Sequence, residues 1–140
     1  MLLHIVARGR IGRGPEAELV DRYMKRLTWP VRLTELPDSG GKVPPVEGQT
    51  RIVMLDETGE MLGSRAFADR LGKWRDEGVR ETRFLIGAAD GFDDAERANA
   101  DLLLSFGRAT WPHLLARAML AEQLWRAASI LAKHPYHREG

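Results

Sequence analysis

Cysteine is missing from all 140 residues of the chain. Its absence excludes disulfide bonds, thiolate metal sites and cysteine nucleophiles, and it makes a cytoplasmic location the default expectation. Long apolar runs are missing as well: no stretch approaches the roughly 18 residues that a membrane helix needs, so no membrane partner is expected. The apolar start of the chain has neither a basic region nor a small-residue cleavage site, so it predicts a strand and not a signal peptide.

A large excess of one charge is also lacking, because 21 Lys and Arg residues face 20 Asp and Glu residues, for a net charge of +1. If the partner is RNA, local basic patches must attract it, since the field of the whole protein is weak. With 44% hydrophobic and 29% charged residues, the composition is that of an ordinary globular protein. We expect one domain, residues 1–140, that buries roughly two-thirds of the surface of its unfolded chain.

The motifs of metal enzymes and of acyl-transfer enzymes are missing too. His134 and His137 stand three apart and His113 opens a helix, but no further ligand has a useful spacing, so no metal site is expected. The absence of Gly-x-Ser-x-Gly excludes the usual serine hydrolases. Asp56 at a strand end would suit a phosphate-accepting receiver domain, yet no acidic pair follows the first strand to hold magnesium.

What the sequence does have is a regular alternation of short apolar runs and amphipathic segments. The runs predict strands at 2–7, 31–36, 51–57, 82–86 and 102–104. The amphipathic segments predict helices at 15–27, from Ser64 to Gly78, at 93–99, and from Pro112 towards Pro135. The alternation favours an α/β fold in which helices flank a mostly parallel five-stranded sheet.

Several boundaries follow from single residues. Ser64 is expected to cap its helix, and Thr58-Gly59 to turn the third strand. The last helix should run into Lys133-His134 and stop before Pro135, which disfavours helical backbone in the preceding residue. The segment 38–50, rich in glycine and proline, predicts a surface loop.

In a parallel sheet, ligands bind beyond the carboxyl ends of the strands. The loops at 56–57, 87–91 and 105–111 should therefore converge. A further loop, 8–14, has three glycines and three arginines after the first strand. It fits either a phosphate contact or a solvated turn.

The last helix carries one apolar stripe and one charged pair. Glu122 and Arg126 are four apart and predict an ordinary ion pair. Trp111 and Trp125 are most simply core or interface residues. The stripe consists of Leu114, Ala118, Ala121, Leu124, Ala128 and Leu131.

Four segments, in order and spacing, resemble one enzyme family. They are Phe84-Leu85-Ile86-Gly87-Ala88-Ala89-Asp90-Gly91, Leu104-Ser105-Phe106 with Thr110-Trp111-Pro112-His113, Glu122-Gln123-Leu124-Trp125-Arg126-Ala127, and His134-Pro135-Tyr136-His137-Arg138-Glu139. They are similar to those of the ribosomal large-subunit pseudouridine N3-methyltransferases, small enzymes of the SPOUT class. The terminal segment is the most specific of the four.

The resemblance implies a SPOUT-type α/β knot, with a trefoil knot near the carboxyl end whose loops bind S-adenosylmethionine. It also implies a homodimer that acts in the cytoplasm on a pseudouridine of 23S ribosomal RNA in the assembled 70S ribosome. The positions that match the cofactor site are Leu55, Gly87, Phe106, Gly107, Arg108, Ala109, Thr110 and Trp111.

The tail, by the same resemblance, completes the active site of the other subunit. His137 is the candidate to assist proton removal, Arg138 to anchor a phosphate or stabilise developing charge, and Tyr136 to stack on a base. The candidate RNA contacts are Arg8, Arg10, Arg13, Lys133 and Arg138.

Three features depart from the family, and two rival functions stay open. Gly87-Ala88-Ala89-Asp90-Gly91 stands where Gly-Gly-x-x-Gly is usual, segment 38–50 replaces a longer helical insert, and Arg8-Gly9-Arg10 stands where Gly-Lys is more usual. One rival is an RNA-binding module of the same fold without turnover. The other is a SPOUT methyltransferase that acts on transfer RNA.

Overall fold

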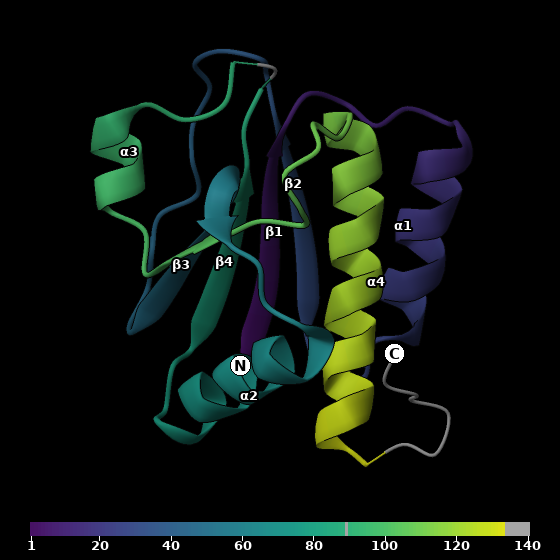
Figure 1. Ribbon diagram of the computed structural model, residues 1–140, viewed down its shortest axis with the longest axis vertical. Coiled ribbons are helices and arrows are strands. Elements are labelled where there is room, and N and C mark those ends of the chain that lie inside the picture. Colours follow the sequence, from purple (N-terminus) through teal and green to yellow (C-terminus); the bar gives the residue numbers. More distant parts are fainter. Residues whose placement is uncertain (89, 134–140) are drawn as a thin grey trace.

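The computed structural model describes residues 1–88 and 90–133. Within these residues a five-stranded sheet has the order β2-β1-β4-β3-β5, and every neighbouring pair is parallel. The strands are β1 (Leu2–Arg8), β2 (Val31–Leu36), β3 (Thr50–Glu60), β4 (Glu81–Ile86) and β5 (Leu102–Leu104). The helices are α1 (Pro15–Arg26), α2 (Ser64–Asp76), α3 (Asp94–Ala98) and α4 (His113–Leu131). The predicted α/β class and sheet are confirmed, and Figure 1 shows the arrangement.

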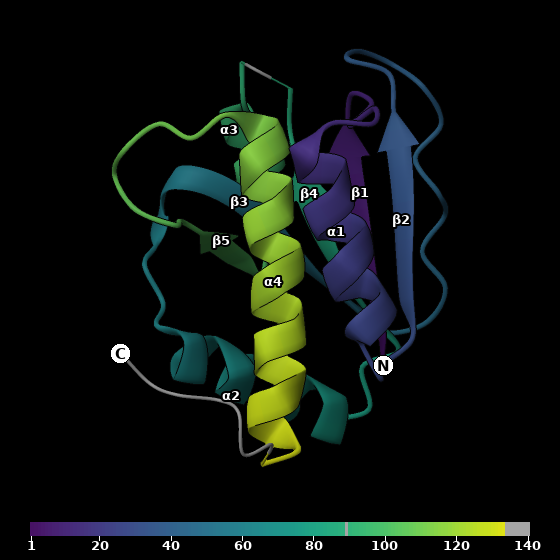
Figure 2. The ribbon, with the colours of Figure 1, turned by 90° about the vertical axis from the view of Figure 1, so that its right-hand side faces the viewer.

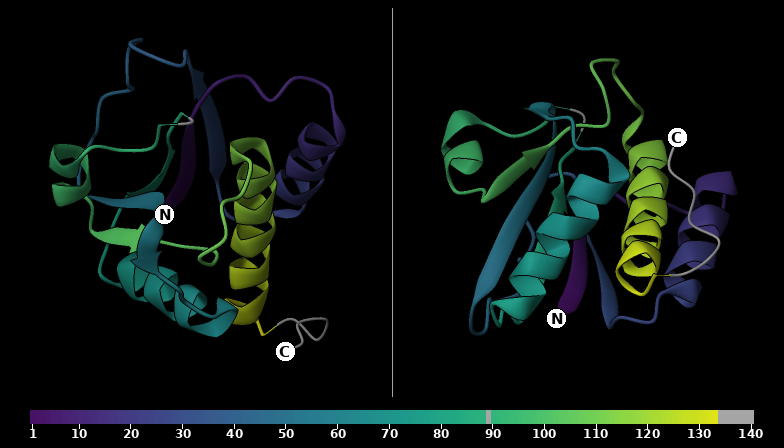
Figure 3. Two further views of the ribbon diagram at one scale, coloured as in Figure 1. Left: turned by 45° about the horizontal axis from the view of Figure 1, so that its top comes forward. Right: turned by 60° about the horizontal axis from the view of Figure 1, so that its bottom comes forward.

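One face of the sheet carries the main core. Ile5 of β1 is in register with Phe84 of β4, which is in register with Val53 of β3, and all three are wholly buried. They pack with buried residues of α2 and α4, while Val20 of α1 packs on Ala118 of α4. Figure 2 shows α4 along this face with α1 beside it, and Figure 3 shows α3 at the opposite edge of the molecule. Three helices therefore cover one face, as the amphipathic pattern requires.

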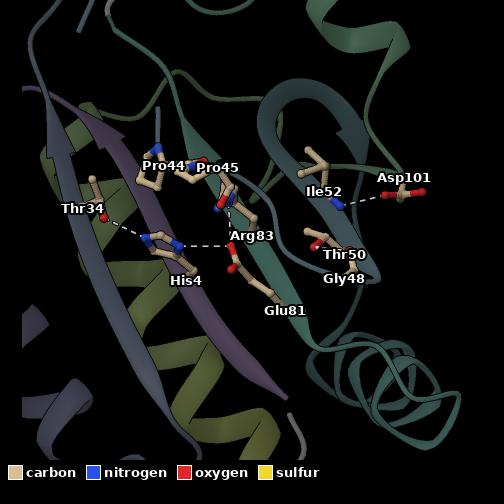
Figure 4. Close-up of polar contacts among 10 residues, drawn as sticks. All are labelled: His4, Thr34, Pro44, Pro45, Gly48, Thr50, Ile52, Glu81, Arg83 and Asp101. Carbon is tan, nitrogen blue, oxygen red and sulfur yellow. Dashed lines mark hydrogen bonds and ion pairs between the residues drawn. The ribbon is translucent and has the colours of Figure 1, made fainter. Parts of the chain in front are cut away.

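The opposite face holds a buried polar network under the segment 37–49, which we call the strap. Arg83 is 2% exposed and donates to Glu81 at 2.6 Å, to the Pro44 carbonyl at 2.7 Å and to the Pro45 carbonyl at 3.3 Å (Figure 4). His4 donates from Nδ1 to Glu81 at 3.0 Å. The strap lacks helix and strand, as predicted, yet its Pro44 and Pro45 carbonyls accept hydrogen bonds from the buried Arg83.

Titration of this network is shifted by its surroundings. Burial lowers the pKa of His4 below its ordinary 6.5, and the hydrogen bond to Glu81 only partly offsets that effect. Burial alone would raise the pKa of Glu81, but hydrogen bonds from Arg83 and His4 outweigh it and hold this pKa below its ordinary 4.5. Near neutral pH the carboxylate is therefore ionised and the imidazole is neutral. The Nε2 atom of the imidazole then accepts from the Thr34 hydroxyl at 2.7 Å.

Two predicted boundaries are wrong around β3 and α2. Thr58-Gly59 does not end β3, which bends and continues to Glu60, so that Leu104 of β5 is in register with both Leu55 and Glu60. Ser64 does not cap α2, because Gly63 occupies the capping position. The Ser64 hydroxyl instead donates to the side chain of Gln123 on α4 at 2.8 Å.

The last helix also ends earlier than expected. It stops at Leu131, and Lys133 has a left-handed φ of 57°, which breaks the helical backbone before Pro135 acts on it. The apolar stripe is confirmed at Ala118, Ala121, Leu124 and Ala128, all buried.

Within residues 1–88 and 90–133 no helix is long and apolar enough to span a membrane. In the same residues no cluster of His, Cys, Asp or Glu side chains is suited to a metal ion. The trefoil knot that the resemblance implies stays a prediction for this chain.

Candidate functional site

The ends of β3, β4 and β5 meet in one hollow at the carboxyl edge of the sheet, as predicted. We call it the strand-end pocket; its volume is about 580 Å³, within the usual range for small-molecule sites. It is lined by residues 55–57, 86–88, 90–91, 104–107 and 109–113, with Arg97 and Ala116. Three loops far apart in sequence thus form a single cavity.

Most of the predicted cofactor positions lie on its wall. The lining includes Leu55, Gly87, Phe106, Gly107, Ala109, Thr110 and Trp111. Arg108 does not line the cavity, and its side chain is exposed. The structure therefore brings seven of the eight positions together, and their contact with a cofactor stays a prediction.

A serine fixes the shape of the loop after β5. Ser105 is 4% exposed; its hydroxyl donates to the Gly107 carbonyl at 2.8 Å and accepts from the Gly107 N–H at 3.1 Å. Gly107 has a φ of +127°, a conformation that side-chain-bearing residues rarely adopt. The loop is therefore bent by two local hydrogen bonds at a position that favours glycine.

Carboxylates form the wall on the β3 side. Asp56 accepts from Arg97 of the α3 segment at 3.1 Å and from the Thr58 hydroxyl at 2.5 Å. Glu57 accepts from the Thr110 hydroxyl at 3.3 Å, which joins the β3 end to the loop after β5. Asp90 also lines the pocket. Of these three carboxylates only Asp56 has a cationic partner, Arg97, among the described residues. The wall therefore keeps negative charge and favours a cationic ligand.

Comparison with known proteins now decides the family. A family model described as predicted SPOUT methyltransferase matches residues 1–137. The chain belongs to the SPOUT methyltransferase family.

Relatives of this SPOUT methyltransferase match over the full length of both chains. The protein named ribosomal RNA large subunit methyltransferase H in Rhizorhabdus wittichii is 77% identical to this chain, over 140 residues that cover 100% of each chain. The relative of that name in Novosphingobium aromaticivorans is 69% identical over 141 residues and 100% of each chain. In Brucella anthropi it is 43% identical over 159 residues and 99% of each chain.

The strand-end pocket fits the methyl donor that the family resemblance implies. Leu55, Ile86 and Phe106 contribute apolar side chains to its lining, and Gly87, Gly91 and Gly107 contribute backbone without a side chain. A Cβ added at Gly87 would lie 3.3 Å from the Phe92 ring and 3.4 Å from the Gly91 backbone, so this turn is tightly packed. S-adenosylmethionine combines an aromatic adenine with a positively charged sulfonium, and it matches an apolar cavity with an acidic wall.

A second hollow adjoins the first. We call it the apolar hollow; it has a volume of about 680 Å³ and shares residues 104–107 with the strand-end pocket. Leu19, Leu115 and Met119 lie on its wall, between α1 and α4. Met61, 57% exposed, lies at its edge. The hollow is thus a largely apolar surface beside the strand-end pocket, and Ser64, Glu122 and Gln123 are polar members of its lining.

Trp111 lies just before α4, and Trp125 and the predicted charged pair lie on this helix. Trp111 is 43% exposed, so it is not a core residue within the protomer. Trp125 is half-buried, with its ring centroid 5.6 Å from that of Tyr23. The predicted ion pair is confirmed, with Arg126 2.5 Å from Glu122.

The predicted RNA contacts are dispersed. Arg8 is half-buried and donates to the carbonyls of Pro37 and Gly40, which occupies its guanidinium. Arg10 and Arg13 are exposed on the loop after β1, and Lys133 is exposed beyond α4. The predicted tail residues Tyr136, His137 and Arg138 lie outside the described residues.

Sequence reasoning missed some residues that build the site. The sequence places Ser105 and Asp56 in loops that are expected to converge, but it gives neither residue a role in shaping the site. The Asp56–Arg97 pair joins residues 41 apart, so no local pattern reveals it. The signal that was available is the Asp-Glu pair at a strand end.

Proposed function

We propose that this protein is an S-adenosylmethionine-dependent methyltransferase that methylates N3 of a pseudouridine in 23S ribosomal RNA, on the 70S ribosome in the cytoplasm. The convergence of the three strand-end loops into one cavity supports this most directly. The family supports methyl transfer, and the names of the full-length relatives support large-subunit ribosomal RNA.

The bound donor supplies an activated methyl group, so the protein has mainly to position the base and to manage one imide proton. In this proposal Leu55, Phe106 and Trp111 cover the adenine, while backbone groups at Gly87 and in residues 107–110 read its polar edge. Glu57 and Asp90 attract the positively charged sulfonium of the donor. Ser105 holds the loop in the required shape.

The tail carries the proton chemistry in this proposal. His137 assists removal of the imide proton because an ordinary histidine titrates near neutral pH. Arg138 binds phosphate or stabilises the negative charge that develops on the base, and Tyr136 stacks on it. Arg10, Arg13 and Lys133 contact the RNA backbone, and Arg8 organises the loop that carries two of them.

A homodimer belongs to the same proposal. The apolar hollow and the exposed side chains of Met61 and Trp111 form apolar surface of the kind that marks protein interfaces. We propose that a second copy covers this surface and places its tail over the strand-end pocket.

The test is methyl transfer from labelled S-adenosylmethionine to three separate substrates: assembled ribosomes, protein-free 23S RNA and transfer RNA. We expect label in ribosomes, located at N3 of a pseudouridine by mass spectrometry of the digested RNA. Label in transfer RNA alone would favour the rival enzyme. Binding to RNA without binding of the donor would favour the module without turnover.

A further inference from the structure

Arg117 of α4 is the most deeply buried arginine of the described residues, at 0% exposure. Its side chain reaches out of α4 towards the end of β1. It donates to the Glu35 carboxylate at 2.6 Å and to the backbone carbonyls of Gly9 at 3.0 Å and Arg8 at 3.3 Å. A single guanidinium thus ties a helix, an edge strand and a loop together.

Glu35 completes the tie from the other side. The same carboxylate oxygen that binds Arg117 accepts from the backbone N–H of Ile11 at 2.8 Å. Gly9 has a φ of +87° and donates to the Leu36 carbonyl at 2.7 Å. The backbone of the loop after β1 is therefore held at Arg8, Gly9 and Ile11.

The loop so held, residues 8–14, lies beside the strand-end pocket. In β1, Ala7 is in register with Ile86 of β4, and Ile86 and Gly87 line the pocket. Ala116, directly before Arg117, lines the same pocket. In Figure 1 the loop passes the end of α4 at which this helix begins, and Ala116 and Arg117 belong to its first two turns. Arg117 therefore connects the wall of the pocket to the loop that exposes Arg10 and Arg13.

A contribution to stability does not by itself explain why an arginine is buried at this position. An ion pair loses its hydration when it is buried, and apolar side chains of similar volume are often at least as stabilising. The Nε atom of Arg117 moreover has no hydrogen-bond partner within the described residues. What the pair supplies is a defined place for a backbone segment, because each of its bonds has a direction.

We infer that Arg117 and Glu35 are positioning residues for the RNA substrate: they fix loop 8–14 so that Arg10 and Arg13 meet RNA phosphates next to the methyl donor. This inference rests on the proposed function. In this inference neither Arg117 nor Glu35 touches the RNA. Their loss should weaken RNA docking while the donor site stays intact.

The test compares Arg117→Met with a matched control, Arg83→Met. Arg83 is also buried, pairs with a carboxylate and binds two backbone carbonyls, but it holds the strap on the far face of the sheet (Figure 4). Methyl transfer is measured against ribosome concentration, below the unfolding temperature of each variant. For Arg117→Met we expect the KM for ribosomes to rise about tenfold, and the dependence of KM on salt to become shallower, because about two phosphate contacts are lost.

For the same variant the kcat and the Kd for S-adenosylmethionine should stay within about twofold of wild type, since the pocket wall is kept. Arg83→Met should leave all three quantities within that range. An equal rise of KM in both variants, or none in Arg117→Met, would overturn the inference. Should Arg117→Met fail to fold, Glu35→Gln gives the same test: a raised KM with an unchanged donor Kd supports the inference, and an unchanged KM overturns it.

The wild-type protein separates this inference from the proposed function. A wild type that methylates ribosomes beside an unaffected Arg117→Met variant contradicts only the positioning role. A wild type that neither binds S-adenosylmethionine nor methylates ribosomes contradicts both.

Discussion

Individual residues with an unusual backbone conformation or unusual burial determine the structure at two places in this molecule. Gly107 bends the loop after β5, and Ser105 holds it through two hydrogen bonds. On the other face, His4 and Glu81 form a buried pair that Arg83 completes. These two places give separate tests, one of ligand binding and one of stability.

Gly107→Ala should weaken binding of S-adenosylmethionine. A side chain at a φ of +127° costs on the order of 1–3 kcal/mol of strain, which the loop relieves by changing its shape. Isothermal titration calorimetry gives the Kd. The control is Gly78→Ala, at a φ of +88° with equally open space but outside the pocket. It should lose stability and keep the wild-type Kd, and equal effects on Kd in both variants would contradict the role of the loop.

His4 makes stability depend on pH. Its pKa is lower in the folded protein than the ordinary 6.5, so the unfolded chain binds the proton more readily as pH falls below 6.5. The free energy of unfolding should therefore decrease through that window. Glu81 adds a further loss only at lower pH, below its ordinary pKa of 4.5.

His4→Gln should remove the first of these losses, because glutamine does not titrate. Urea unfolding of both proteins at about pH 7.5, 6 and 5 measures the free energy of unfolding in that window. The variant is expected to be less stable than wild type at the highest pH but to have a flatter pH dependence. An unchanged slope would show that His4 is not the titrating group.

Among the elements, β3 and β5 determine whether the pocket exists. Glu60 and Leu55 of β3 both pair with Leu104, so the bent end of β3 wraps around the short β5. Gly59 makes this approach possible: a Cβ added there would lie 2.5 Å from the carbonyl carbon and oxygen of Leu103. No side chain fits at that distance.

Gly59→Ala should therefore push β5 away from β3. We expect a loss of about 2–3 kcal/mol in the free energy of unfolding, measured by urea denaturation, together with weaker binding of the methyl donor. Gly63→Ala is the matched control, since a Cβ there meets nothing within 4 Å among the described residues. A Gly59→Ala protein as stable as Gly63→Ala would contradict the close packing.

The tail is a second element with a defined test. Removal of residues 135–140 should abolish methyl transfer and leave the Kd for S-adenosylmethionine within about twofold of wild type, because the tail is proposed to act on the RNA base. Transfer of labelled methyl to ribosomes and calorimetry on the same preparation check both parts. Full activity of the truncated protein would refute the role of Tyr136, His137 and Arg138.

The sequence predicted those elements whose signal is local. Apolar runs, Pro15 and the Asp93-to-Asn99 pattern place nearly every strand and helix correctly, because propensity and capping act within a few residues. The convergence of the three loops also followed, from the geometry of parallel sheets.

What the sequence did not predict depends on distant partners. Thr58-Gly59 has the composition of a turn, but Leu55 and Glu60 on either side of it both pair with Leu104, and this pairing keeps it within β3. Ser64 has the chemistry of a cap, but Gln123 binds its hydroxyl. Arg117 was not singled out at all, because both its carboxylate partner and its backbone partners lie far away in the chain.

At the scale of the whole molecule, the proposed dimer explains why apolar surface lies open beside the pocket. Met119 of α4 is half-buried in the apolar hollow, where a charge would face the second copy. Val43, 48% exposed on the strap, offers a comparable apolar side chain on the other face.

Met119→Glu should shift the protein from dimer to monomer, because an unpaired carboxylate is costly in an apolar interface. Val43→Glu should stay dimeric. Sedimentation velocity at micromolar concentration measures both. A monomeric wild type, or equal dissociation of the two variants, would contradict the proposed interface.

The most direct test of the central claim is a crystal structure of the protein with S-adenosylmethionine. The account predicts electron density for the donor in the strand-end pocket, between residues 55–57, the Gly87 turn and residues 106–111. Density in the apolar hollow instead, or a strand-end pocket that stays empty at saturating donor, would contradict it.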